Sequence, residues 1–506
     1  MTSDDIVALS ATEMRRRIGA RQLSPVELLQ ACIARIEATN PYVNAVTATC
    51  FERALGEARA AEQAVMDGRP LGLLHGLPLG VKDLEETAGL LTTYGSPIYR
   101  ANVPAADNVL VARLRAAGAI VAGKTNVPEM GAGANTRNPV WGATGNPFDT
   151  NLNAGGSSGG SAAALALDML PVCTGSDTGG SLRIPAALCG VVGFRPSPGV
   201  VPSSRKPLGW TPISVVGPMG RTVADACLQL AATAGLSASD PLSHELDPLS
   251  FLLPPAIDLS RLRVGYTEDF GACAVDDGLR AVFRDKIAAM RHLFHSCEPI
   301  DLQLGDVHRC FDVLRAEAFV AGMHEAYTRD PASLGPNPRA NYEMGAAMSL
   351  LDSAWAQAEQ TRILKRFQQA YEMVDVILSP TTPLSPFPWV QPHASHINGQ
   401  TQQNYYRWLS LTYVTTLTTH PSLSLPCGSD HAGMPFGLQI VGRFRADRHT
   451  LGVAQALEQA FDASPALRRP RPELARLRHA EPALGSIVTA PPLLGAVSAG
   501  AAASAV

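Results

Sequence analysis

The chain has 506 residues, of which 46% are hydrophobic and 17% are charged, and its formal net charge at neutral pH is −4. This hydrophobic content supports a large buried core, and the slightly acidic balance gives no electrostatic reason to expect a nucleic acid partner. The first residues, MTSDDIVAL, lack the basic and apolar regions of a secretory signal. We therefore expect a cytoplasmic globular protein.

Nine cysteines are scattered singly along the chain, without a CxxC pair. An odd number without paired spacing indicates neither a disulfide framework nor a zinc site. We expect buried thiols in a reducing compartment, no metal and no cofactor.

Two capping boxes near the start predict helices. The first consists of Ser10 and Glu13, and the second lies in the segment SPVE that begins at Ser24. A proline directly after the capping serine favours a helix start. The apolar spacing that follows predicts that this second helix runs to Asn40.

Between about residues 72 and 230, short apolar runs such as AIVA and LPVCT alternate with helical stretches such as VLVARLRAAG. This alternation is typical of an α/β layer fold, in which loops at strand ends carry the chemistry. Residues 237–256 are rich in Pro, Ser and Asp, and the chain from there to about 375 is predicted to be mostly helical apart from the run RVGYTED.

The C-terminal residues 476–506 are expected to form a disordered tail. Residues 482–506 contain no charged side chain and consist mostly of Ala, Gly, Pro, Ser and Val. Two arginines precede this stretch, which is a pattern of membrane anchors, but its adjacent prolines and its few bulky apolar residues weigh against an anchor. We expect no membrane association.

Two serines on separate glycine-rich loops, Ser157 and Ser181, suit hydrolysis of an acyl bond. The glycines before Ser181 allow a sharp turn in which consecutive N–H groups point at one spot and stabilise an oxyanion. Ser181 is the candidate nucleophile. No histidine lies between His75 and His244, so we expect a different base.

Lys82 fits this role, because the apolar run before it is predicted to carry its amine into the interior. Burial lowers the pKa of a lysine and makes it able to accept a proton near neutral pH. Ser157 is placed where it can relay that proton between Lys82 and Ser181, as in Ser–Lys catalysis. Gly/Ser loops also occur as plain turns or phosphate cradles, so the residues alone leave these alternatives open.

The residue spacing of two further motifs, a phosphate-binding loop and a GxSxG nucleophile motif, also occurs in the chain. Gly118, Gly123, Lys124 and Thr125 satisfy a phosphate-binding loop, but a helix precedes the first glycine and Asn126–Pro128 disfavours a helix after the threonine.

Ser157 also lies at the centre of a GxSxG pattern, which makes it the nucleophile of an alternative Ser-His-Asp esterase with His420 or His431 as base. The polar run FDTNLNAG before it is not the apolar strand that this motif needs.

With these residues in view, the chain resembles the amidase signature family over about residues 5–465. The resemblance is carried first by GGSSGG at 155–160 and GSDTGGSLRIP at 175–185. The further matching blocks are GVKD at 80–83, GKTNVPEM at 123–130, CGVVGFRPSPG at 189–199, SPTTP at 379–383 and PFGLQIVG at 435–442.

The resemblance implies a single α/β domain over residues 1–475, with a large mixed sheet flanked by helices and a helical variable region over about 237–400. It implies that Lys82 is the base, Ser157 the relay after a cis peptide, and Ser181 the acyl-enzyme nucleophile. It also implies further roles: oxyanion donation by the backbone N–H groups of Thr178, Gly179, Gly180 and Ser181, acyl-site contacts by Met130 and Gly131, and bracing by Asp177 and Arg183.

The function we expect is hydrolysis of a small or medium carboxylic amide, with anilides, esters or carbamates as further substrates. The first alternative is the amidase subunit of a tRNA-dependent amidotransferase, which releases ammonia from glutamine within a complex. The presence of all three catalytic residues disfavours a silent binding protein.

Arg407 can pair with a substrate carboxylate, although a lone arginine is more often solvated. A homodimer stays open.

Overall fold

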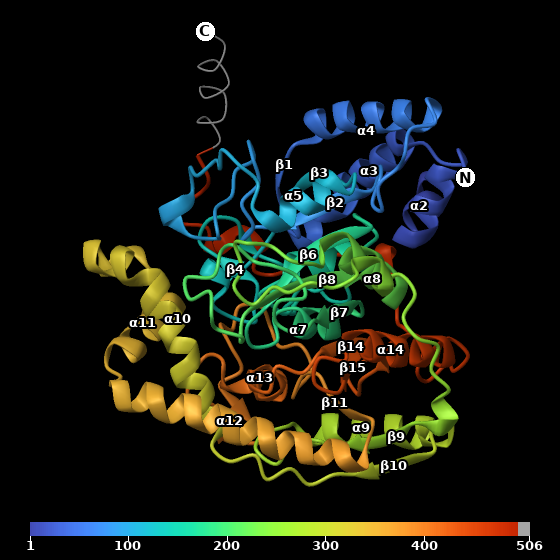
Figure 1. Ribbon diagram of the computed structural model, residues 1–506. Helices are drawn as coiled ribbons and strands as arrows, with labels where there is room; N and C mark the ends of the chain where they lie inside the picture. Colours follow the sequence, from blue (N-terminus) through green and yellow to red (C-terminus); the bar gives the residue numbers. More distant parts are fainter. Residues whose placement is uncertain (494–506) are drawn as a thin grey trace.

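The computed structural model describes residues 1–493, and one large sheet of 11 strands runs through it from β1 to β10 (Figure 1). In spatial order its strands are β1 (Val46–Thr49), β3 (Ile120–Thr125), β2 (Pro78–Lys82), β6 (Val172–Asp177), β8 (Val215–Gly220), β7 (Val192–Arg195), β14 (Ser422–Ser429), β15 (Pro435–Val441), β11 (Val376–Pro380), β9 (Arg263–Tyr266) and β10 (Ser296–Pro299). Two small sheets pair β4 (Arg137–Asn138) with β5 (Gly142–Ala143) and β12 (His396–Ile397) with β13 (Gln400–Thr401).

The large sheet is mixed. Strand β2 pairs in parallel with both β3 and β6, whereas β8, β7, β14 and β15 form an antiparallel series. Parallel pairing returns where β9 pairs with β10 and β11. The predicted α/β architecture with a large mixed sheet and flanking helices is confirmed.

Helices surround the sheet, and α6 and α7 contact each other as well as the central strands. The helices are α1 (Ser3–Val7), α2 (Ala11–Gly19), α3 (Pro25–Val43), α4 (Phe51–Met66), α5 (Val109–Ala116), α6 (Gly159–Ala166), α7 (Arg183–Cys189), α8 (Val223–Thr233), α9 (Asp277–Met290), α10 (Val307–Arg329), α11 (Pro336–Ala346), α12 (Leu350–Met373), α13 (Ser410–Leu417) and α14 (Asp447–Asp462).

The predicted helix starts are confirmed at α2 and α3. Ser10 and Ser24 are the N-caps, and Ser24 forms the predicted capping box with Glu27. The box predicted at Ser10 is wrong, because Ser10 accepts the N–H of Glu13 but the Glu13 carboxylate pairs with two arginines of the same helix. The end of α3 differs from the prediction, since the helix continues past Asn40 to Val43. Pro41 lies in the last turn, and Asn44 then ends the helix with a left-handed φ of 50°.

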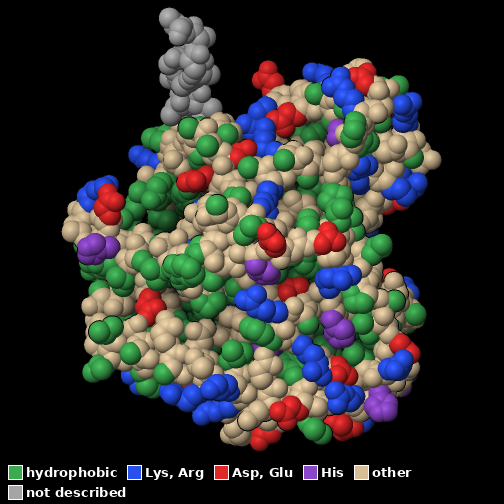
Figure 2. Space-filling view, viewed as in Figure 1, with side chains coloured by type: hydrophobic (Ala, Val, Ile, Leu, Met, Phe, Trp, Pro, Cys, Tyr) green, Lys and Arg blue, Asp and Glu red, His purple; other side chains and the backbone are tan. Residues whose placement is uncertain are grey.

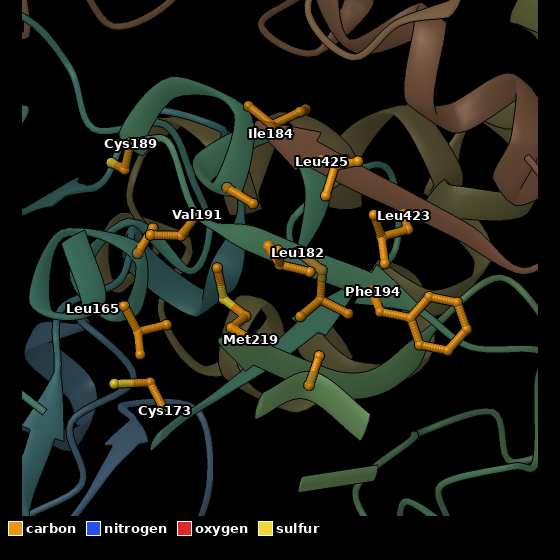
Figure 3. Close-up of a cluster of buried hydrophobic side chains, with 14 of the residues drawn as sticks. Leu165, Cys173, Leu182, Ile184, Cys189, Val191, Phe194, Met219, Leu423 and Leu425 are labelled. Carbon is orange, nitrogen blue, oxygen red and sulfur yellow. The ribbon is translucent and has the colours of Figure 1, made fainter. Parts of the chain in front are cut away.

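The core beneath the glycine-rich loops is closely packed (Figure 3). Leu182 and Met219 meet over Gly175, where an added Cβ would lie 2.4 Å from Leu182 Cδ2 and 3.0 Å from Met219 Sδ. Phe194 on β7 is fully buried in the same cluster. The glycine in β6 is therefore required by the approach of these side chains.

The expected helical region contains α9 to α12, with β9 at the run RVGYTED. Strand β10 was not predicted there, because its short run SCEP has no alternating apolar pattern. Helices α10 and α11 pack against each other and project at one side of the molecule (Figure 1).

The predicted disordered tail is wrong for residues 476–493. Leu484 and Ala480 are buried against Trp389 and Ala143, and the N–H of Leu493 donates to the carbonyl of Arg100 at 2.9 Å. Apolar contacts with distant segments, which local composition does not reveal, order this stretch. The rest of the predicted tail, 494–506, lies outside the described residues. Within 1–493, no helix has the length and apolar character needed to cross a bilayer.

All nine cysteines are free thiols; eight are buried as expected, whereas Cys50 is only half-buried.

Replacing Phe194 by alanine should lower the free energy of unfolding by about 3–5 kcal/mol, because a buried ring is lost and the cavity cannot collapse fully. Urea unfolding followed by tryptophan fluorescence measures this change. Leu253→Ala is the matched control, since Leu253 is 81% exposed and its loss should change stability by less than about 0.5 kcal/mol. Equal midpoints for the two variants would contradict this account of the core.

Candidate active site

Lys82 is the last residue of β2, and its side chain is fully buried. The strand runs between β3 and β6, where Gly80 leaves room for its neighbours: an added Cβ would lie 2.8 Å from Leu170 Cδ1 and 3.0 Å from Cys173 Sγ. Close packing on both sides excludes water from the amine. Burial lowers the pKa of Lys82 from 10.5 to about 7.

Three serine hydroxyls surround the amine of Lys82. The Nζ atom donates to Oγ of Ser157 at 2.8 Å, of Ser158 at 2.7 Å and of Ser176 at 2.9 Å. A neutral amine has two N–H donors and one lone pair, so in that state one of the three hydroxyls donates to Nζ instead. The arrangement therefore allows a proton to pass from a serine to Lys82.

The structure brings Lys82 and Ser157 together as the sequence predicted, and the Gly156–Ser157 peptide is cis. Sequence reasoning missed Ser158 and Ser176 as partners of the amine. A signal for the second was present, because Thr174 and Ser176 are two residues apart in strand β6 and so share one face. The hydroxyl of Thr174 accepts the backbone N–H of Lys82 at 2.8 Å.

Ser181 lies on the loop between β6 and α7 and is half-buried. Gly180 has a φ of 122°, and an added Cβ there would lie 2.2 Å from Thr412 Oγ1. At Gly179 an added Cβ would lie 3.0 Å from the ring of Phe311. Both positions need glycine, which fixes the path of the chain into Ser181.

The four predicted oxyanion donors are reduced to three by this geometry. The N–H of Gly180 donates to Oδ1 of Asp177 at 2.8 Å and is therefore engaged within the protein. Among the described residues, no protein acceptor receives the N–H groups of Thr178, Gly179 or Ser181. These three amides are the ones free to bind an oxyanion.

Asp177 and Arg183 brace the loop with both side chains fully buried. Arg183 Nε donates to Oδ2 at 3.0 Å and Nη2 to Oδ1 at 2.9 Å. Sequence reasoning missed Arg195, whose Nη1 lies 3.1 Å from Oδ1 and also donates to the carbonyl of Asp177. Burial opposes the ionisation of Asp177, but the two arginines outweigh it and hold its pKa well below the usual range.

Met130 and Gly131 lie beside the relay serine. An added Cβ at Gly131 would lie 3.6 Å from Ser157 Oγ and 2.9 Å from Leu84 Cδ1. Met130 packs with Leu84 and Tyr94 in a small apolar cluster. This cluster forms a wall next to the serine, with the Arg205 guanidinium 4.9 Å from the centroid of the Tyr94 ring and the Tyr94 hydroxyl donating to Glu86 at 3.1 Å.

A second wall comes from α10 and α13. Phe311 and Tyr413 stack with their ring centroids 4.2 Å apart, and the Phe311 ring faces Gly179. Arg407 does not reach out from this wall, because it is buried and donates to Asp312 at 2.7 Å and to the Tyr413 hydroxyl at 2.9 Å.

The competing motifs find no support. Lys124 is buried inside β3, donates to Thr87 Oγ1 at 3.0 Å, and no helix begins at Thr125, so these residues form no phosphate cradle. His420 stacks on Tyr371 within a cluster of rings, and His431 is exposed between β14 and β15. The hydroxyl of Ser157 instead contacts Lys82.

In residues 1–493, no cluster of three or more His, Cys, Asp or Glu side chains is placed to hold a metal.

Comparison with known proteins identifies the family of the chain. The amidase family model matches residues 27–451. An acylamidase from Rhodococcus erythropolis is 34% identical, with 92% of this chain and 99% of the relative covered. A glutamyl-tRNA(Gln) amidotransferase subunit from Picosynechococcus sp. is 32% identical, with 88% of this chain and 97% of the relative covered. The crystal structure of a bacterial aryl acylamidase of the amidase signature enzymes superposes with a TM-score of 0.83 at 29% identity, covering 90% of this chain and 96% of that one. The chain belongs to the amidase family, the amidase signature enzymes.

Proposed function

We propose that this chain is a free-standing amidase that cleaves a small or medium carboxylic amide through an acyl-enzyme on Ser181. The observation that carries the proposal is the buried amine of Lys82, which lies 2.8 Å from the Ser157 hydroxyl and has a pKa of about 7. A buried lysine poised to take a proton is an arrangement typical of catalysis, since burial without a role only costs stability.

In the proposed reaction the Ser181 oxygen attacks the substrate carbonyl carbon. Its proton passes to Ser157, whose own proton passes to neutral Lys82. The amides of Thr178, Gly179 and Ser181 stabilise the oxyanion that forms. The proton then returns through Ser157 to the leaving nitrogen, the C–N bond breaks, and water cleaves the Ser181 ester by the same relay in reverse.

The surroundings of the site favour a neutral substrate. Leu84, Met130 and Tyr94 form the wall beside Ser157, and the nearby arginines are paired, Arg407 with Asp312 at 2.7 Å and Arg205 with Glu85 at 3.6 Å. The acylamidase and aryl acylamidase relatives support the same substrate class by name. Acidic and basic side chains are interspersed on the face shown in Figure 2, which suits a small molecule better than a polyanion. Free thiols in all nine cysteines support action in the cytoplasm.

A second candidate is hydrolysis of glutamine within an amidotransferase complex. It is favoured by the glutamyl-tRNA(Gln) amidotransferase relatives, whose identities of 31–33% are near that of the acylamidase. A member of such a complex should require its partners and prefer glutamine, whereas a free-standing amidase should act alone on neutral amides.

We predict that the purified protein alone releases product from an aliphatic amide, an anilide or a carbamate in a panel that also holds a matched ester and glutamine. Ser181→Ala should lower kcat by more than about 10⁴-fold, because the covalent intermediate is lost. Ser260→Ala, at an exposed serine outside the site, is the matched control. Glutamine turnover that appears only with added partner proteins would favour the second candidate.

The pH profile should follow Lys82. Its neutral form is the base, so kcat/KM should be low in acid and rise as the pH increases through about 7, the pKa that burial gives this amine. A profile that is flat from about pH 5.5 to 8.5 would contradict the role of Lys82. Product release measured in constant-ionic-strength buffers gives the profile, and Lys365→Ala on the exposed face of α12 is the control.

Lys82→Ala should harm amide cleavage more than ester cleavage, by at least about tenfold, since an amine leaving group depends on proton delivery more than an alkoxide does. The measurement is kcat/KM for an amide and an ester with the same acyl group. Equal losses for the two substrates would argue against proton delivery through Lys82 and Ser157.

A further inference from the structure

Glu129 is a buried carboxylate that the proposed reaction does not use. It begins the short 3₁₀ helix Glu129–Gly131 after β3 and is only 7% exposed. No lysine, arginine or histidine of residues 1–493 lies within 4 Å of its carboxylate, unlike that of Asp177. A buried carboxylate without a cation is costly, so other groups must compensate it.

Two donors from distant segments provide this compensation. The hydroxyl of Ser96 donates to Glu129 Oε1 at 2.8 Å, and the N–H of Gly335 donates to the same oxygen at 3.3 Å. Gly335 is the N-cap of α11, where the helix dipole favours a negative charge. An added Cβ at Gly335 would lie 1.8 Å from Oε2, so any larger residue there would displace the Glu129 carboxylate.

Two more hydrogen bonds hold the same three segments together. Asn337 in the first turn of α11 donates from Nδ2 to the carbonyl of Ala132 at 2.8 Å, and the N–H of Met130 donates to the carbonyl of Tyr94 at 2.8 Å. The wall formed by Met130 and Gly131 is therefore fixed on one side by residues 94–96 and on the other by the start of α11.

We infer that Glu129 is a positioning residue that clasps α11 to the loop carrying Met130 and Gly131 and so sets the substrate-binding wall beside Ser157. The inference deepens the proposed amidase function and rests on it. Glu129 has no contact with Lys82 or Ser181 among the hydrogen bonds of the described residues, so its effect should fall on substrate binding.

Both donors reach Oε1 of Glu129, and they bind the ionised carboxylate more strongly than the neutral carboxyl. Burial raises its pKa above the ordinary 4.5, while the hydrogen bonds from Ser96 and Gly335 act in the opposite direction, and no charged side chain contributes. A pKa that is raised in the clasped state means that protonation favours this state over an open one, so KM should not rise as the pH falls through it.

Glu129→Gln tests the clasp, because it keeps the shape of the side chain and removes its charge at every pH. We expect KM for a neutral amide to rise about tenfold, because a neutral amide oxygen accepts hydrogen bonds more weakly than a carboxylate, with kcat within about twofold of wild type. Glu343→Gln is the matched control, since Glu343 is exposed on the same helix and its carboxylate accepts a hydrogen bond from Tyr327.

Hydrogen exchange gives a readout that does not need turnover. In Glu129→Gln the amides of residues 94–99 and of the first turn of α11 should exchange faster than in wild type, and Glu343→Gln should match wild type. If the wild type turns over no amide, the proposed function fails, yet the exchange still decides whether the clasp exists.

Two results would overturn the inference. Unchanged KM and unchanged exchange in Glu129→Gln would show that the carboxylate holds nothing in place, and a fall in kcat at constant KM would move its role to the chemistry. If Glu129→Gln fails to fold, Gly335→Ala replaces it: Gly335 has an ordinary φ of −64°, so the added methyl disturbs the carboxylate and not the backbone. It should reproduce the rise in KM.

Discussion

The burial of one primary amine at the end of a central strand is the constraint on which the site depends. Lys82 loses its hydration, and because no carboxylate of the described residues lies within 4 Å of it, the neutral form becomes accessible near pH 7. The hydroxyls of Ser157, Ser158 and Ser176 satisfy its hydrogen bonds without restoring the charge. The parallel pairing of β2 with β6 makes this possible, since both strands end at the same edge.

Asp177 is a second buried ionisable group, and its surroundings keep it charged, whereas those of Lys82 favour the neutral form. Asp177 is ionised between Arg183 and Arg195, so these three side chains together carry one positive charge. Glu85 and Asp177 raise the pKa of Lys82 and Arg205 lowers it, but burial outweighs these charges and brings the pKa to about 7. The excess charge lies under the loop of Ser181, where it favours the negative charge that develops on a substrate oxygen. The same ion cluster thus holds the loop and tunes its surroundings.

The candidate site residues were predicted from the sequence because glycine spacing and residue type identify them within short segments. Lys82, Ser157 and Ser181 lie in short motifs, and the alternating elements around them predicted an α/β fold, whereas the large mixed sheet was implied by the family resemblance. Local patterns did not predict contacts between distant segments: Arg195 on Asp177, or Gly335 on Glu129. The order of residues 476–493 was missed for the same reason, because Leu484 is held by Trp389 and Ala143 and not by its neighbours in sequence.

The strand order has a consequence for how the chain is made. Strand β7 ends at Arg195, yet its partner β14 begins only at Ser422. At typical synthesis rates the roughly 200 residues between them take on the order of 10 to 50 s to emerge. During that time the half of the sheet that carries Lys82, Ser157 and Ser181 is complete except for a bare edge at β7. This edge is a template for pairing with other chains, so nascent chains are exposed to aggregation until β14 arrives to cover it.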